Sequence, residues 1–92
     1  MAQLLSDEEI ASRLRSTEWT REGDEIVRER GFQDFAQAIA FVNRVAEAAE
    51  AANHHPDIFL HGWNKVKLAL TNHSAGGLTE VDFEMAGQFD AL

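Results

Sequence analysis

The chain contains no cysteine, so it can form neither a disulfide bond nor a thiolate metal site. This absence matters because a chain of 92 residues buries only about 60% of the surface that its unfolded form exposes. Domains of this size commonly depend on disulfides, metals or partner subunits for stability. With disulfides excluded, we expect residues 1–92 to form one domain that assembles as a homodimer or homotetramer.

Basic residues are scarce as well. The chain has 8 Lys and Arg against 16 Asp and Glu, and 8 − 16 gives the formal net charge of −8. An acidic domain repels phosphate backbones and anionic lipid surfaces, which argues against direct nucleic-acid binding and against membrane docking. No apolar run approaches the roughly 20 residues that a membrane span needs, and the first residues lack the basic region of a signal peptide. We expect a cytoplasmic protein.

Glycine and proline are absent from residues 33–52, where the helical period is clearest. Apolar residues recur there at steps of three or four, which predicts a helix of about 20 residues. Its predicted inner face carries Phe35, Ile39, Val42, Ala46 and Ala49, widened by Ala38 and Val45. The helix must end before Pro56, the one proline of the chain, because the residue before a proline favours extended geometry.

Two shorter helices are predicted near the ends of the chain. Ser6-Asp7-Glu8-Glu9 is a capping box, which predicts a helix from there to about Leu14. Thr79-Glu80-Val81-Asp82 resembles a second helix start, and this helix should run to about Phe89. Its predicted buried residues are Phe83, Ala86 and Phe89.

Four strands complete the pattern. Residues 19–21 and 26–30 flank a glycine among acidic residues, which is typical of a hairpin, and the charged second strand needs a wet face or an edge position. Residues 57–61 and 65–71 form a second strand pair, and Val66, Leu68 and Leu70 share one face of the last strand. The order α-β-β-α-β-β-α predicts the α+β class: a four-stranded antiparallel sheet with three helices packed on one face.

Histidine is the residue type most suggestive of function. His54, His55 and His61 fall within eight residues, and His73 follows the alternating strand. Imidazole changes charge near neutral pH, which suits proton transfer. Adjacent histidines on extended backbone diverge, and no HExxH pattern is present, so we predict no metal. Ser74 has no elbow motif around it, and spacing alone leaves open that the histidines are solvent-facing loop residues.

A compound motif extends beyond the histidines. Glu50-Ala51-Ala52-Asn53-His54-His55-Pro56 is followed by Trp63-Asn64-Lys65-Val66, then Leu70-Thr71-Asn72-His73, then Gly77-Leu78-Thr79 and Asp82. This series resembles the signature of the pterin-4a-carbinolamine dehydratases in order and near-identical spacing. Trp19 and Phe32-Gln33-Asp34-Phe35 extend the resemblance, so that it covers most of the chain.

The resemblance implies a fold, an assembly and a reaction. The family has a four-stranded antiparallel sheet with three helices on one side, and its members form dimers or tetramers. Its enzymes remove water from 4a-hydroxytetrahydrobiopterin to give quinonoid dihydropterin, and so recycle the pterin used by aromatic amino-acid hydroxylases. The pterin is the substrate, and no cofactor is implied. Some relatives act instead as dimerisation cofactors for a transcription factor or as assembly factors, which leaves a non-catalytic interaction module as the alternative.

The resemblance also implies roles for individual residues. His54 and His73 would carry out the proton transfers, and His55 would bind and orient the pterin. Asp82 would fix the tautomer of an imidazole, for which we expect His73.

Three further residues are implied in substrate binding. Glu50 would hydrogen-bond the pterin or a histidine, Asn72 belongs to the same motif, and Trp19 would line the pocket or pack in the core. His61 has no counterpart in the signature and is expected to be incidental. Asn53 stands where relatives often carry aspartate, and the segment from Pro56 to Trp63 is one residue longer than in some of them.

Overall fold

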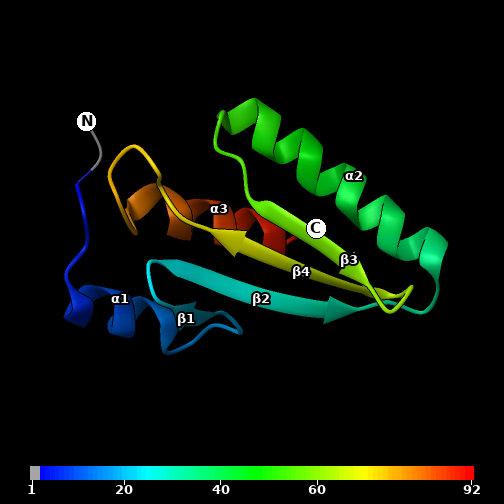
Figure 1. The fold of residues 1–92 in the computed structure, drawn as a ribbon, viewed down its shortest axis with the longest axis horizontal. Coiled ribbons are helices and arrows are strands. Elements are labelled where there is room, and N and C mark those ends of the chain that lie inside the picture. The colour runs from blue at the N-terminus through cyan, green and yellow to red at the C-terminus, as the bar shows by residue number, and fades with distance from the viewer. Residues whose placement is uncertain (1–2) are drawn as a thin grey trace.

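The computed structural model describes residues 3–92. Its elements follow the predicted order and are drawn in Figure 1: α1 (Asp7–Leu14), β1 (Thr20–Glu22), β2 (Glu25–Gly31), α2 (Phe35–Ala52), β3 (Asp57–His61), β4 (Lys65–Leu70) and α3 (Glu80–Asp90). The first helix begins at the predicted capping box, in which Ser6 and Glu9 each bond the other's backbone amide. Within residues 3–92, no helix is long and apolar enough to cross a membrane.

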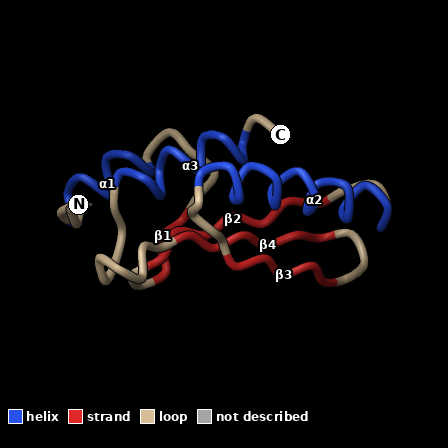
Figure 2. Tube along the Cα trace, turned by 90° about the horizontal axis from the view of Figure 1, so that it is seen from above, coloured by secondary structure: helices blue, strands red, loops and turns tan. Residues whose placement is uncertain are grey.

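The four strands form one antiparallel sheet in the order β1-β2-β4-β3. Figure 2 shows the helices on one side of this sheet, with the other face uncovered, as the element order predicts. Asp57 at the start of β3 lies opposite Ala69 near the end of β4. Because of this register, the segment that precedes β3 and the loop that follows β4 lie at the same end of the sheet.

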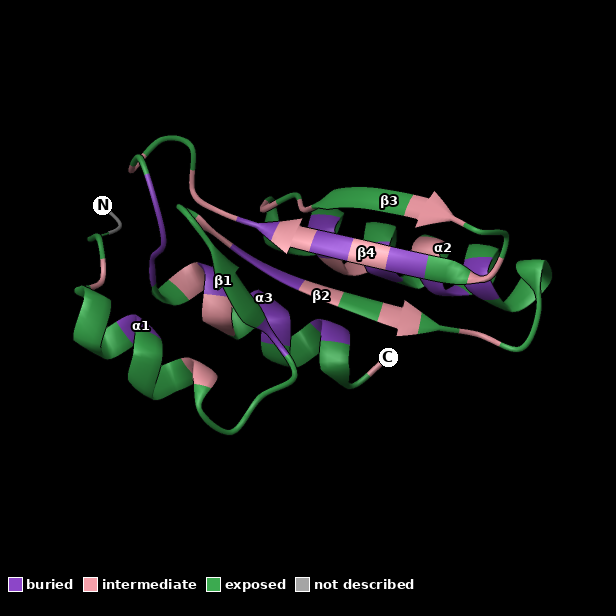
Figure 3. Cartoon of the chain, turned by 60° about the horizontal axis from the view of Figure 1, so that its bottom comes forward, coloured by how far each residue is buried: buried purple, intermediate pink, exposed green. Residues whose placement is uncertain are grey.

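The core lies between the sheet and the helices. Val66, Leu68 and Leu70 of β4 are buried, and the residues between them are not, which confirms the predicted alternation (Figure 3). From α3, Ala86 and Phe89 are buried as predicted, whereas Phe83 is only partly covered.

The inner face of α2 differs from the prediction. The buried stripe is Ala38, Phe41, Val45 and Ala49. Phe35 and Ile39, which were predicted to face the core, are 53% and 38% exposed. The helix is rich in alanine and apolar on two sides, so periodicity alone does not determine which side meets the sheet. The side of α2 that carries Phe41 faces the core because the Phe41 ring packs against that of Phe32, just beyond β2, with ring centroids 5.0 Å apart.

The charged strand β2 lies inside the sheet and not at its edge. Its apolar Ile26 faces the core. Arg28 and Arg30 of the same strand bond residues in the last turn of α3. At the opposite hairpin, Gly62 and Trp63 both have positive φ (56° and 59°), which gives β3 and β4 their tight connection. Gly62 suits this conformation, which L-residues with a side chain rarely adopt.

Candidate active site

The site begins where α2 ends. Asn53 adopts the left-handed conformation, with φ of 51° and ψ of 42°, and asparagine tolerates this geometry better than most residues. The amide of His54 then donates to the carbonyl of Ala49 at 3.1 Å. The helix therefore stops before Pro56, as predicted, but Asn53 makes the turn that directs the two histidines away from the helix axis.

His54 is joined to the start of α3. Its Nε2 lies 2.6 Å from Oδ1 of Asp82, the third residue of that helix. The Asp82 side chain is fully buried, and that of His54 is 14% exposed. A buried carboxylate requires hydrogen-bond or charge partners, and Asp82 has them: its Oδ2 accepts the Thr79 amide at 2.9 Å. One imidazole is thus held by a carboxylate that the helix N-terminus itself stabilises.

This contact corrects the predicted partner of Asp82. We expected the carboxylate to hold His73, whereas it hydrogen-bonds His54. The reason is the packing of the helices: α3 begins beside the end of α2, so its first turn meets the histidine that leaves α2. His73 lies earlier, in the loop that leads to α3.

His55 pairs with a different carboxylate from that of His54. Its Nε2 hydrogen-bonds Oε2 of Glu50, in the last turn of α2, and both side chains are exposed. Glu50 was expected to bond either the pterin or a histidine, and the structure pairs it with His55. The adjacent histidines thus each have a carboxylate partner, one buried and one at the surface.

His73 is carried by a loop that Asn72 organises. The carbonyl of Asn72 accepts the amides of Ala75, Gly76 and Gly77, and its side-chain oxygen accepts the Ala75 amide at 3.1 Å. His73 is exposed and lines a cavity of about 280 Å³ together with Asn72, Thr71 and residues 24–25 of the β1–β2 turn. Asn72 therefore has a structural task in addition to any contact with a ligand.

The sheet register places these groups at the same end of the sheet, although the cavity that His73 lines includes neither His54 nor His55. His54 and His55 precede β3, and His73 follows β4, at the end where Asp57 pairs with Ala69. Within residues 3–92, no hydrogen bond joins His73 to either histidine of the pair. Nor do three His, Asp or Glu side chains of this range converge in a way that could hold a metal ion. The expectation that no metal takes part stays a prediction.

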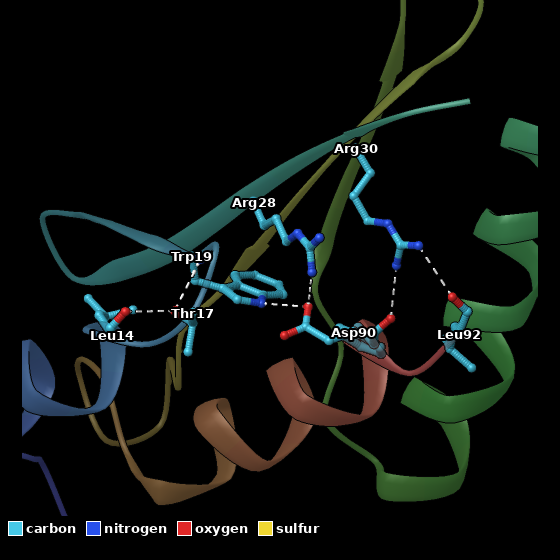
Figure 4. Close-up of polar contacts among 8 residues, drawn as sticks. Leu14, Thr17, Trp19, Arg28, Arg30, Asp90 and Leu92 are labelled. Carbon is cyan, nitrogen blue, oxygen red and sulfur yellow. Dashed lines mark hydrogen bonds and ion pairs between the residues drawn. The ribbon is translucent and has the colours of Figure 1, made fainter. Parts of the chain in front are cut away.

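Trp19 lies elsewhere, which corrects its predicted place in the site. Its side chain is 3% exposed, and its Nε1 donates to Oδ1 of Asp90 at 2.9 Å, at the C-terminal end of α3 (Figure 4). It lines a separate cavity of about 220 Å³ with Phe83 and Gly87. Trp19 takes the alternative role, core packing, because it bonds Asp90 in the last turn of α3, whereas His54 bonds Asp82 in the first turn.

His61 lies at the far end of β3 from the histidine pair. Its ring stacks on Phe59, with centroids 4.8 Å apart, and its Nε2 bonds Glu29 of β2 on the uncovered face of the sheet. Sequence reasoning named Asn53 and Thr79 but did not assign their tasks in the site, which are the left-handed turn at Asn53 and the bond from Thr79 to Asp82. The signal for both was local: an asparagine at a helix end, and a helix N-cap three residues before an acid.

The chain is thus a small α+β protein with a four-stranded antiparallel sheet covered by three helices and with histidine–carboxylate pairs at one end. The family model described as pterin 4 alpha carbinolamine dehydratase matches residues 3–92. A curated relative from Nostoc sp., named "Putative pterin-4-alpha-carbinolamine dehydratase", is 55% identical, with 100% of this chain and 99% of the relative covered. One of the same name from Nocardia farcinica is 54% identical, covering 98% and 95%.

Solved structures agree. A crystal structure from Brucella melitensis, described as a transcriptional coactivator/pterin dehydratase, matches with a TM-score of 0.88 and 34% identity over 95% of each chain. A pterin dehydratase-like protein identified as a RuBisCO assembly factor in the alpha-carboxysome matches with a TM-score of 0.69 and 25% identity, covering 83% of this chain and 89% of that one. The chain belongs to the pterin-4-alpha-carbinolamine dehydratase family.

Proposed function

We propose that this protein is a dehydratase that removes water from 4a-hydroxytetrahydrobiopterin and gives quinonoid dihydropterin. The observation that carries the proposal is the buried pair of His54 and Asp82 at 2.6 Å, directly beside the surface pair of His55 and Glu50. The names of the relatives supply the substrate class.

The reaction needs two proton movements and no change of oxidation state. The bond between C4a and its hydroxyl breaks, and the hydroxyl leaves as water after it receives a proton. The N5 proton departs to a base, and its electron pair forms the C4a=N5 double bond. Positioned general acids and bases typically contribute about 10²- to 10⁴-fold to such steps. A carbinolamine is already activated by its neighbouring nitrogen, so this contribution suffices.

In this mechanism His54 and His73 exchange the two protons, and His55 binds and orients the pterin. Asp82 holds His54 and stabilises its charged form when it carries the extra proton. Glu50 fixes His55, and Asn72 shapes the loop that carries His73. The protein's own residues supply all of these functions, so we propose that no cofactor and no metal takes part.

The product suggests the cellular setting. Quinonoid dihydropterin is the form that must be reduced before a hydroxylase can use the pterin again. We therefore place the enzyme after an aromatic amino-acid hydroxylase, in the cytoplasm, in tetrahydrobiopterin recycling.

A stopped-flow assay tests the proposal. The purified protein should accelerate the absorbance change that accompanies decay of 4a-hydroxytetrahydropterin. His73→Ala should lose about 10²-fold of that rate because a proton-transfer group is removed. Its circular dichroism should stay that of the wild type, since His73 is exposed in a loop.

His61→Ala is the matched control. It removes an imidazole that also bonds a glutamate, but at the far end of β3, so the dehydration rate should not change. A His73→Ala variant as fast as the wild type would overturn the role of His73. Loss of activity with a chelator, and recovery with zinc, would replace the proposed mechanism by a metal-dependent one.

We also propose that the chain self-associates, as its small size predicts. Phe35 and Ile39 form an exposed apolar stripe on α2, and Phe59 on edge strand β3 is 60% exposed. An uncovered edge strand and an apolar helix stripe are typical of surfaces that second copies cover. Sedimentation velocity at micromolar concentration should show a dimer or tetramer, and a monomer would contradict the proposal.

The same exposed surfaces favour a second function, a protein-interaction module on the dehydratase fold. Two relatives of known structure are described as a coactivator/pterin dehydratase and as an assembly factor. The histidine–carboxylate pairs favour the enzyme, because an interaction module has no need of a buried imidazole–carboxylate contact. An inactive wild-type protein in the stopped-flow assay would favour the module.

A further inference from the structure

Thr79 is a buried polar residue that belongs to the compound motif but has no role in the proposed mechanism. It is 1% exposed and caps the N-terminus of α3. Its backbone amide donates to Oδ2 of Asp82 at 2.9 Å, and its hydroxyl lies 3.4 Å from the same oxygen. Thr79 therefore saturates one oxygen of the Asp82 carboxylate.

The backbone around Thr79 is itself held in place. The Leu5 amide donates to the Leu78 carbonyl at 2.9 Å, and Leu4 forms an antiparallel bridge with Thr79. The segment before α1 thus lies along the residues that start α3. This contact fixes the direction of the Thr79 amide, and with it the plane of the carboxylate that the amide bonds.

The second oxygen of Asp82 then determines the proton positions on His54. Oδ2 of the carboxylate accepts from Thr79, and Oδ1 lies 2.6 Å from Nε2 of His54. An ionised carboxylate offers no proton, so Nε2 must carry one. The nitrogen of His54 that gains and loses a proton is consequently Nδ1.

We propose that Thr79 is a positioning residue that, through Asp82, holds His54 in the Nε2–H tautomer with Nδ1 as its reacting atom. The catalytic part of this inference rests on the proposed dehydratase function. The tautomer part does not, because it follows from contacts within the chain. It also names the side of the imidazole that must face the C4a–N5 bond of the substrate.

The test combines ¹⁵N NMR of the histidine rings with the stopped-flow assay. In the wild type above the titration of His54, the Nδ1 resonance should have the shift of an unprotonated nitrogen and Nε2 that of a protonated one. Thr79→Val keeps the shape and the backbone amide bond to Oδ2 and removes only the hydroxyl contact. The Nε2–H form of His54 should stay the major one, with a measurable fraction of the Nδ1–H form, and dehydration should slow by about three- to tenfold, the worth of one weak hydrogen bond to a charged group.

Thr79→Ser is the matched variant, since it restores the hydroxyl and should return both the tautomer and the rate toward the wild type. A protein that merely lost stability would not change the ring shifts of its folded form. A protonated Nδ1 on neutral His54 in the wild type would overturn the inference, whatever the variants do. An inactive wild type with the expected shifts would overturn the dehydratase function and support the positioning by Thr79.

Discussion

The two ends of α3 each place an aspartate against the rest of the fold, and the two are used differently. Asp82, in the first turn, is fully buried and bonds the titratable ring of His54. Asp90, at the last residue, bonds the indole of Trp19 and the guanidinium of Arg28 (Figure 4). The two aspartates are eight positions apart, which separates them by about 12 Å along the helix.

The group that each aspartate bonds determines whether its contact can take part in a reaction or only stabilises the fold. Indole and guanidinium keep their protons at any pH at which the protein is folded, so Asp90 can only hold elements together. Imidazole exchanges its proton near neutral pH, so the contact at Asp82 can take part in a reaction. The two ends also differ in burial, since the side chain of Asp82 is fully buried and that of Asp90 is 33% exposed. The residue type is the same, so the titratable partner and the burial together distinguish the two ends.

The largest effect should come from exchanging the charge at Asp82. In Asp82→Asn the amide oxygen takes the Thr79 amide, and the NH₂ group then faces Nε2 of His54. Nε2 must accept, which places the proton of the neutral ring on Nδ1. We expect the dehydration rate to fall by about 10²- to 10⁴-fold, with little change in circular dichroism.

Asp90→Asn is the matched variant for this comparison. It removes the same charge from the other end of α3 and should leave the rate within twofold, on the order of the effects seen for sites outside the chemistry. Equal rate losses in the two variants would show that the contrast between the two ends is false.

A smaller effect, on stability alone, is expected at the C-terminal end of α3, where Asp90 lies. Arg30 donates to the carbonyls of Phe89 and Leu92 and lies 4.5 Å from the ring centroid of Phe41. Burial, and then the neighbouring charge of Arg28, lower the pKa of its guanidinium, because both disfavour the charged form.

Arg30→Met keeps the aliphatic stem and removes the charge-assisted bonds. We expect the free energy of unfolding in urea to fall by about 2 kcal/mol, a typical value for hydrogen bonds to a charged group together with a cation–π contact. The dehydration rate of the folded protein should not change. Arg30→Lys should recover part of the stability, because the ammonium retains the charge but not the planar fork. A rate loss in either variant would couple the two ends of α3.

The sequence predicts most of this architecture because its signals are local. The alternation of residues 65–70 and the capping box at Ser6 each determine an element without help from distant residues. The inward face of α2 could not be predicted, because two apolar stripes share one helix and only packing against Phe32 and the sheet selects Phe41.

The contacts of the candidate site also include one that local sequence predicts and one that depends on tertiary packing. The bond between Glu50 and His55 spans five residues at one helix end, so it lies within reach of local reasoning. The bond between His54 and Asp82 spans 28 residues and depends on how α3 meets α2. The family signature pointed to Asp82 as a partner for an imidazole, but the choice between His54 and His73 required the packing of the two helices.

The smallest effect concerns a third acid, Glu9, whose place in α1 repeats that of Asp82 in α3. Both are the third residue of their helix and accept the amide of the N-cap residue, Ser6 or Thr79. Glu9 is exposed at the surface and bonds no imidazole. Hydrogen bonds from the Ser6 backbone and then from its side chain lower the pKa of Glu9 below its ordinary 4.5.

A pKa that is lower in the folded state stabilises the fold above the unfolded value and ceases to do so as the pH falls through the folded value. The stability difference between the wild type and Glu9→Gln should therefore be present at neutral pH and shrink below about pH 4.5, because there the unfolded chain takes up the proton before the folded chain does. Urea midpoints of the two proteins measured from pH 7 to pH 3 test this. The dehydration rate should be the same in both, since a carboxylate at a helix start affects catalysis only where an imidazole lies on its other oxygen. A rate change in Glu9→Gln would mean that the capping geometry itself, and not the histidine partner, sets the function of the carboxylate in α3.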